Sequence, residues 1–452
     1  MDTKDFLLAP FFLIIIYAIA YSIRNRSFPV GSPLRRYFIW GLHLKIVGAF
    51  ATAAIYWYYY GGGDSIFYFW RTEYLRQLMF RDFSTFQKVF FGKPDLFNSS
   101  TYFAVRTLKA YDASSFLVVK LAYLSSFPAM GTYIGIALIF SMISYIGIWK
   151  LFMKAAELFP DINPKYFAYA ILFIPSVFFW GSGLFKDTVT LGCSCLLIVA
   201  FHNLVMKRED IVRNVILIVI CGYLIGVIKS YILLALAPAL LIWAVFSLRN
   251  KIKNGFIRSA ITPVFIVISI GIGFVLLQQL GSVFTKFNLE NIEQKAEGMQ
   301  RWHTVRAVQK GEASAYSLGH VEFTASGILK KAPAAINVAL FRPYLWEAGN
   351  PVMLLAAVEA IVFFGLFVWL IVLHPFFAWN QIGKESFLLF CLIFTIIFSF
   401  SVGFTSYNFG ALVRYKIPCL PLLGIIYAVL LGRIKNKKAA IKEENSQLEI
   451  VE

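Results

Sequence analysis

The stretch FLLFCLIFTIIFSFSVG, residues 387–403, contains no charged side chain and decides the class of fold. Apolar runs of about 17–25 residues are long enough, as α-helices, to cross the hydrocarbon core of a bilayer. Similar runs recur along the chain, and they predict spans at 6–23, 38–59, 128–149, 166–181, 188–205, 212–228, 231–247, 259–279, 351–373, 387–403 and 416–432. Residues 114–127 are a candidate for a further short or re-entrant helix.

The composition of the 452-residue chain agrees with this pattern. Hydrophobic residues make up 59% of it and charged residues only 15%, whereas soluble chains carry roughly a quarter charged residues. The short alternating segments of a β-barrel are absent from the sequence. The predicted fold class is therefore an all-α, polytopic transmembrane helical bundle of about eleven spans.

The formal charge of +18 does not indicate a nucleic-acid-binding protein, because the basic residues are spread over loops between the apolar runs. About twenty of the 42 Lys and Arg residues fall on one side of the predicted topology, which should be the cytoplasm. The N-terminus is then outside and the C-terminus inside. We predict a single transmembrane domain over 1–432 and a charged cytoplasmic tail over 433–452.

Two long loops, at about 60–115 and 281–350, fall on the opposite, outer face. Phe67, Trp70 and Tyr74 share one face of a predicted helix in the first loop, which is typical of an amphipathic helix in the membrane interface. The second loop opens with a polar, helix-prone stretch. All five cysteines lie in or beside apolar runs, so we expect them to be buried small side chains.

The first candidate site is the stretch WYYYGGGDSIFYFW, residues 57–70, which places Asp64 after three glycines at the mouth of the second span. Glycine allows positive φ angles and a close approach of the backbone to a ligand. Asp64 could simply cap the following helix, since aspartate is a good N-cap. The alternative is that it is a general base or a metal-binding carboxylate at the membrane surface.

The second candidate site is IPSVFFWGSGLFKDTVTLG, residues 174–192, where Lys186 and Asp187 begin a helix at an outer turn. Lysine could hold a phosphate, and the adjacent carboxylate could orient it or polarise a hydroxyl. The third is YNFGALVRYKIPCLPLL, residues 407–423, in which Arg414 lies on the outer side. Arginine matches a phosphate with its forked donors, although Arg414 could also reach towards lipid head groups.

Weaker candidates complete this set. Lys229 lies in an outer turn between two spans, and Arg342 and Glu347 close the second loop. Glu359 falls within an apparent span, where an acid is by default a functional hypothesis. The remaining basic or imidazole side chains are expected to be solvated or to reach the lipid surface: His43, Lys45, His303 and His320.

The stronger candidates share the outer face although they are far apart in sequence. An outer site with one acid and several cations suits an anionic, lipid-linked substrate. Beyond membrane lipids, the expected partners are such a donor and a glycan or lipid acceptor. Short loops favour the inner membrane of a bacterium.

The chain resembles the polyprenyl-phosphate-dependent integral membrane glycosyltransferases of the GT-C superfamily, in architecture and in three motifs. These are G-D-S at 63–65 with the helix after it, P-S…W-G-S-G…K-D within 175–187, and R-Y-x-x-P-x-x-P at 414–421. The resemblance implies an inverting transfer of sugar from a lipid phosphate donor on the non-cytoplasmic face.

By this resemblance Asp64 would deprotonate the acceptor hydroxyl or hold a divalent metal, Mg²⁺ or Mn²⁺. Many relatives carry two acids in the first loop, and Asp187 is the candidate for the second carboxylate here. Cations would stabilise the departing phosphate where its charge develops. The predicted substrate-binding residues are Trp180, Lys186, Lys229, Arg342, Arg414 and Tyr415.

Three other classes of function stay open. A polymerase or ligase of lipid-linked oligosaccharides would use loop arginines, for which Arg301, Arg306 and Arg342 are available. A secondary transporter or flippase would show several ionisable groups deep in the spans and matching halves, and the sequence contains no clear repeat. A purely structural membrane protein would leave the outer polar residues without a purpose.

Overall fold

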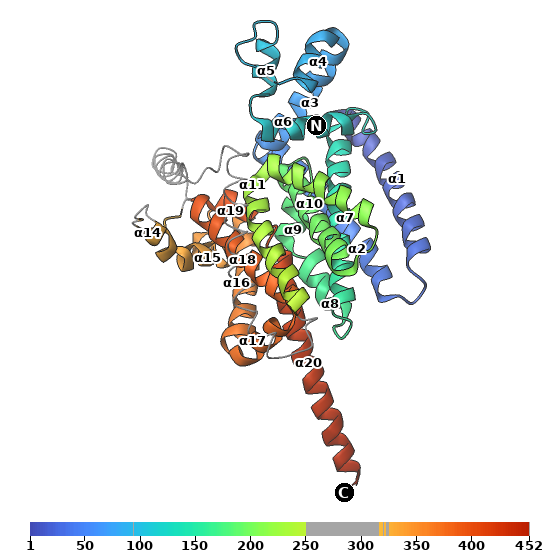
Figure 1. Ribbon diagram of the computed structural model, residues 1–452. Coiled ribbons are helices and arrows are strands. Elements are labelled where there is room, and N and C mark those ends of the chain that lie inside the picture. Colours follow the sequence, from blue (N-terminus) through green and yellow to red (C-terminus); the bar gives the residue numbers. More distant parts are fainter. Residues whose placement is uncertain (94, 250–315, 320, 322–324, 452) are drawn as a thin grey trace. The chain divides into compact units, whose positions relative to one another are not determined.

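The computed structural model describes residues 1–93, 95–249, 316–319, 321 and 325–451 (Figure 1). Every regular element in these residues is helical, which confirms the all-α prediction. The chain divides into two compact units, each made of several segments. Unit 1 comprises 1–150, 177–200 and 212–230, and unit 2 comprises 151–176, 201–211 and 231–452. The prediction of a single domain over 1–432 stays a prediction.

Seven described helices are long and apolar enough to cross a membrane, and the chain is an integral membrane protein. They are α1 (Thr3–Ser27), α2 with η1 (Pro33–Tyr59), α7 (Tyr133–Leu158), α10 with η3 (Lys186–Lys207), α11 (Ile211–Arg249), α16 with η6 (Pro351–Val372) and α18 (Ser386–Thr405). The count is eight if α19 (Phe409–Tyr415) and α20 (Leu420–Val451), bent by 64° at their break, form one span.

The predicted eleven spans are therefore matched only in part. The runs 212–228 and 231–247 both lie in α11, which is interrupted at Lys229 by non-helical dihedral angles. The run 166–181 contains only short helices, namely α8 (Pro164–Phe167), the π-helix η2 (Ala168–Leu172) and α9 (Pro175–Trp180). The run 259–279 lies outside the described residues.

The first predicted outer loop is largely helical. It contains α3 (Asp64–Arg81), α4 (Phe83–Phe91), α5 (Tyr102–Leu108) and the start of α6 (Ala113–Ser126). Phe67 and Trp70 are exposed on α3, as an interfacial helix requires, while Leu75 on its other face is buried. The second predicted loop is described only at its end, by α14 (Ala325–Lys330), α15 (Ala332–Phe341) and η5 (Leu345–Glu347).

Within unit 1, several helices begin at the same end. The Asp5 carboxylate in α1 accepts a hydrogen bond from the backbone N–H of Ile134 in α7, at 3.0 Å. The hydroxyls of Ser65 in α3 and Tyr133 in α7 are 2.7 Å apart. The N-termini of α1, α3 and α7 therefore lie together, and we call this the Asp64 end of unit 1.

In unit 2, a ring cluster and close helix contacts form the core. The ring of Trp243 in α11 packs on those of Phe387 and Phe390 in α18, with centroids 4.9 and 5.0 Å apart. Gly403 lies so close to α15 that a Cβ there would be 2.0 Å from the carbonyl oxygen of Ala335. The remaining elements of this unit are α17 (Pro375–Lys384), the π-helices η3 (His202–Lys207) and η6 (Val368–Val372).

Helices α7 and α10 touch through glycines, and this contact can be tested. A Cβ at Gly147 would lie 2.2 Å from the backbone oxygen of Gly192, whereas a Cβ at Gly222 in α11 would meet nothing within 4 Å. We expect Gly147→Ala to destabilise the protein by about 1–3 kcal/mol, because two backbones must separate. Gly222→Ala should be neutral or stabilising by up to about 1 kcal/mol. Thermal unfolding in detergent measures both, and equal midpoints would contradict the packing.

Candidate functional site at the Asp64 end of unit 1

The glycine stretch before Asp64 has the backbone geometry that only glycine adopts easily. Gly61 and Gly63 have φ angles of +60° and +106°. A side chain at Gly63 would collide with the Tyr56 ring, since a Cβ there would be 2.8 Å from its Cε1. Gly63 is the N-cap of α3, so Asp64 occupies the first helical position. Its exposed carboxylate lies where the positive end of the helix dipole favours an acid.

The segment 181–185 is non-helical and buried within unit 1. Its Gly183 has φ +82°, and its N–H donates to the Ser141 hydroxyl at 2.8 Å. The ring of Phe185 packs edge-to-face on Tyr56, with centroids 4.9 Å apart. Because Gly63 borders the same Tyr56 ring, the start of α10 lies at the Asp64 end.

Lys45 holds the beginning of this segment, a role that the sequence did not indicate. Its Nζ donates to the carbonyl oxygen of Gly181 at 2.6 Å and to the Ser144 hydroxyl at 3.2 Å. The residue is only 2% exposed, so the prediction that Lys45 reaches the cytoplasmic lipid surface is wrong. A buried cation here satisfies a carbonyl group that the broken helix leaves without an intrahelical partner.

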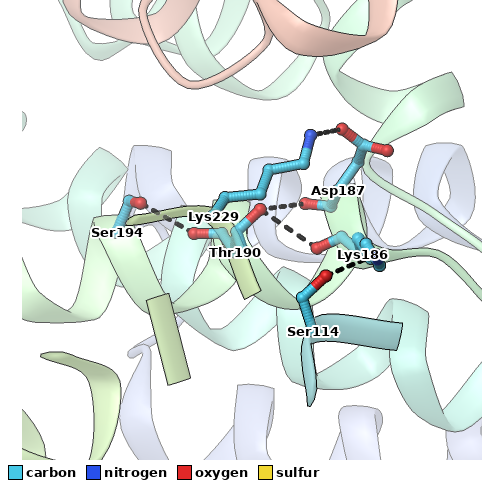
Figure 2. A network of polar contacts seen from close by, with 6 residues as sticks. All are labelled: Ser114, Lys186, Asp187, Thr190, Ser194 and Lys229. Atoms are coloured by element: carbon cyan, nitrogen blue, oxygen red, sulfur yellow. Dashed lines mark hydrogen bonds and ion pairs between the residues drawn. The ribbon is translucent and has the colours of Figure 1, made fainter. Parts of the chain in front are cut away.

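Lys186 faces the beginning of α6. Its ammonium donates to the Ser114 hydroxyl at 2.6 Å (Figure 2). It also lies 3.8 Å from the Asp112 carboxylate. The Lys186 side chain is partly exposed, so its charge is accessible to a ligand. The Asp112 carboxylate also accepts a hydrogen bond from Ser115, at 2.6 Å. The partly exposed Lys186 ammonium is therefore held in place by the polar groups of Ser114 and Asp112.

Asp187 and Lys229 form a buried ion pair. Their side chains are 2% and 8% exposed, and the ammonium of Lys229 donates directly to the Asp187 carboxylate (Figure 2). The dihedral angles of Lys229, φ −147° and ψ 72°, interrupt α11 at this contact. Burying two charges is tolerated when they are paired, and removal of either one would take away the counter-charge in direct contact with the other.

The polar side chains further along α10 serve the helix itself. The Thr190 hydroxyl donates to the carbonyl oxygen of Lys186 at 3.0 Å, and that of Ser194 donates to Thr190 at 2.7 Å (Figure 2). Such back-bonding to the preceding turn leaves these hydroxyls little capacity for a ligand. The candidate groups at this end are therefore Asp64, Lys186 and the Asp187–Lys229 pair.

Trp180 does not present its ring at the surface. It is buried, and it packs edge-to-face on Phe179 with centroids 4.7 Å apart. Its predicted contact with a substrate stays a prediction.

Arg342, Arg414 and Tyr415 belong to unit 2. The Nε of Arg342 donates to Glu347 at 3.0 Å, and its Nη2 contacts the other carboxylate oxygen. The guanidinium carbon also lies 5.1 Å from the centre of the Phe409 ring. Arg342 thereby fixes the chain just after α15. Arg414 and Tyr415 end α19 and are half-buried.

The Arg342–Glu347 contact also tunes the carboxylate. Desolvation by itself raises the pKa of Glu347. Hydrogen bonds from Arg342 and from the backbone N–H of Tyr344 outweigh it, and they hold that pKa below its usual value. Glu347 is therefore ionised at neutral pH. It binds the Arg342 guanidinium, which the sequence predicted to bind substrate.

The metal prediction for Asp64 stays a prediction. Among the described residues, no three His, Cys, Asp or Glu side chains lie together in a way that could hold a metal ion. Asp187, the candidate for the second carboxylate, is in direct contact with the ammonium of Lys229. A positive charge is therefore already present beside Asp187. His303 and His320 lie outside the described part of the chain.

Comparisons with known proteins do not place the chain in a family. No family model matches its sequence, and neither a curated protein nor a solved structure matches it.

Proposed function

We propose that the chain is a membrane glycosyltransferase that moves a sugar from a polyprenyl-phosphate-linked donor to an acceptor hydroxyl. One observation carries the proposal: an exposed acid, a partly exposed lysine and a buried Asp–Lys pair gather at one end of unit 1. An acid and a cation at one surface match the two needs of the reaction, which are removal of the acceptor proton and stabilisation of the departing phosphate.

Each residue has a distinct role in this proposal. Asp64, exposed at the start of α3, is the general base. Lys186 binds the donor phosphate with a charge-assisted hydrogen bond. Asp187 and Lys229 are positioning residues, because their charges are buried and paired with each other. Arg414 and Tyr415 lie in unit 2, and their contact with the donor stays a prediction, while Arg342 supports the loop near them.

The site is proposed to face away from the cytoplasm, in the inner membrane of a bacterium, and to act in cell-envelope glycan assembly. Positive-inside charge distribution supports this orientation. The basic tail helps to test it, since Ala439 in α20 is exposed, as is Ser99 in the first predicted outer loop. All five native cysteines are buried and should give little background.

An impermeant thiol reagent applied to intact cells should label Ser99→Cys and leave Ala439→Cys unlabelled. Permeabilised cells should label both, which controls for reactivity. Labelling of Ala439→Cys alone in intact cells would invert the topology and remove the outer-face argument.

A second candidate function, a secondary transporter or flippase, is favoured by one observation. Buried ionisable side chains lie well inside the spans, among them Lys45 in α2 and Glu359 in α16. Intramembrane ionisable residues often mark ion or substrate pathways. The polymerase or ligase alternative has no such support, because Arg301 and Arg306 lie outside the described residues.

Purified full-length protein in liposomes separates these functions. The donor is a polyprenyl-phosphate-linked hexose labelled in the sugar, and a nucleotide sugar is the control donor. A transferase should attach label covalently to an added glycan acceptor while free polyprenyl phosphate accumulates. Recovery of unchanged donor in the opposite leaflet would instead identify a flippase and overturn the proposal.

A further inference from the structure

Glu359 is an acid in the middle of a predicted span and takes no part in the proposed sugar transfer. It is the ninth residue of α16 (Pro351–Phe367), about 12 Å along the helix from its first residue. Only 6% of it is exposed. Burial of an ionised carboxylate at such a place is very costly unless a cation or several donors compensate for the charge.

The two oxygens of the Glu359 carboxyl group have different surroundings in unit 2. Oε2 accepts a hydrogen bond from the backbone N–H of Ser176, at 2.7 Å. Oε1 is buried and has no hydrogen-bond partner among the described residues. The donors to this carboxyl group in the described residues all come from Ser176, and none of them reaches Oε1. A carboxylate that is stabilised by hydrogen bonds accepts two or three.

Lys416 interacts electrostatically with this carboxyl group but does not form an ion pair with it. Lys416 is 1% exposed and lies at the break between α19 and α20. Its ammonium donates to the carbonyl oxygen of Arg342 at 3.2 Å. No ion pair of 4.0 Å or less joins Lys416 to Glu359 in the described chain, in contrast to the direct contact of Lys229 with Asp187.

Other titratable groups near this break do not replace the missing donor. From the break itself, Cys419 points its thiol to the carbonyl oxygen of Lys416, at 3.1 Å. Arg342 is engaged by Glu347. Tyr427 in α20 packs on Phe363, one turn after Glu359 in α16. Among the described residues, Lys416 is thus the charged group that interacts electrostatically with Glu359.

We propose that Glu359 is a proton-binding site, with the proton carried on the buried Oε1. The bound proton removes the negative charge, and an unpaired neutral carboxyl costs far less in this environment than an unpaired carboxylate. Release of the proton would create a negative charge beside Lys416 at the 64° break between α19 and α20. A charge change at a broken helix couples proton binding to the position of that helix, as in proton-linked membrane proteins.

A hydrophobic carbodiimide tests this site in the full-length protein. Dicyclohexylcarbodiimide takes the proton of a buried carboxyl group, and the carboxyl oxygen adds to its central carbon, so no other reactant is needed. We expect peptide mass spectrometry at pH 7 to find the adduct on Glu359 at a rate at least about ten times that on Asp187, because the Asp187 carboxylate is held in an ion pair with Lys229. The adduct should be absent in Glu359→Gln.

Two variants make the result decisive. Lys229→Met removes the ammonium in direct contact with Asp187, and a rise in the labelling of Asp187 in this variant shows that the reagent reaches buried acids. Glu359 should stay reactive in Lys416→Met, at a rate within a few-fold of the wild type. Absence of the Glu359 adduct in wild type, while Asp187 reacts in Lys229→Met, would overturn the proposal. An adduct that forms only in Lys416→Met would also overturn it, because Lys416 would then keep Glu359 ionised.

Discussion

Asp64→Asn is expected to lower the rate of sugar transfer by about 10²–10⁴-fold, the range typical of losing a general base. The amide has nearly the same shape as the carboxylate but cannot accept the proton of the acceptor hydroxyl. Folding should change little, since Asp64 is exposed and Gly63, not Asp64, is the N-cap of α3. Transfer from a labelled polyprenyl-phosphate donor, with thermal unfolding beside it, measures both effects.

A matched control lies on the same helix. Glu73 in α3 forms a partly exposed salt bridge with Arg76, at 3.2 Å. Glu73→Gln removes the same charge at a different place and should leave transfer within about twofold, because such surface pairs contribute little. Equal activity of both variants and the wild type would show that Asp64 only favours the start of α3. Loss of transfer on chelation of Mg²⁺ or Mn²⁺ would add a metal to the role of Asp64.

Asp187→Asn is expected to destabilise the protein by about 3–5 kcal/mol, because it removes the counter-charge in direct contact with the buried Lys229 ammonium. The double variant Asp187→Asn/Lys229→Met should recover most of this loss, since no charge is then buried at the contact. Sugar transfer should remain low in the double variant, because the positioning pair is gone. Unfolding in detergent gives the two stabilities under one set of conditions.

This comparison separates a positioning role from a purely structural one. If the pair serves only folding, the double variant will regain transfer together with stability. If the two single variants and the double variant differ by simple addition, Asp187 and Lys229 are not coupled and the buried pair is not formed. Either result would remove the pair from the proposed site.

Apolar length alone predicted most of the membrane helices, because a helix that crosses a bilayer must be apolar over about 20 residues. It could not predict the interrupted ones. Pro175 and the following glycines were visible, but the sequence did not show that 181–185 stays buried and non-helical. That conformation depends on Lys45, which is 136 residues away from Gly181 in the chain.

The candidate site shows a similar division. Topology predicted that Asp64, Lys186 and Lys229 lie on one face, and the structure places all three in unit 1. The residues before the first two, Gly63 and Phe185, both border the Tyr56 ring. The direct pairing of Asp187 with Lys229 was not predicted, because it depends on the interruption of α11 at Lys229. Asp112 and Ser114 were missed as well. Their signal was an aspartate three residues before Ser115 at the start of an apolar helix, a common capping pattern.

The arginine predictions were limited for another reason. A sequence shows that a cation is present but not which side chain it is paired with in the fold. Arg342 is paired with Glu347. Arg414 and Tyr415 lie in unit 2, so their relation to Asp64 stays a prediction.

The central claim is that Asp64 and Lys186 act in one site, and a double-mutant cycle on sugar transfer tests it most directly. Lys186→Met should lower kcat/KM for the polyprenyl-phosphate donor by about 10–100-fold, as expected for loss of a hydrogen bond to a charged group. If both residues act on the same transition state, adding Lys186→Met to Asp64→Asn should cost clearly less than it does in the wild type. Strictly additive losses, or full transfer in both single variants, would contradict the account.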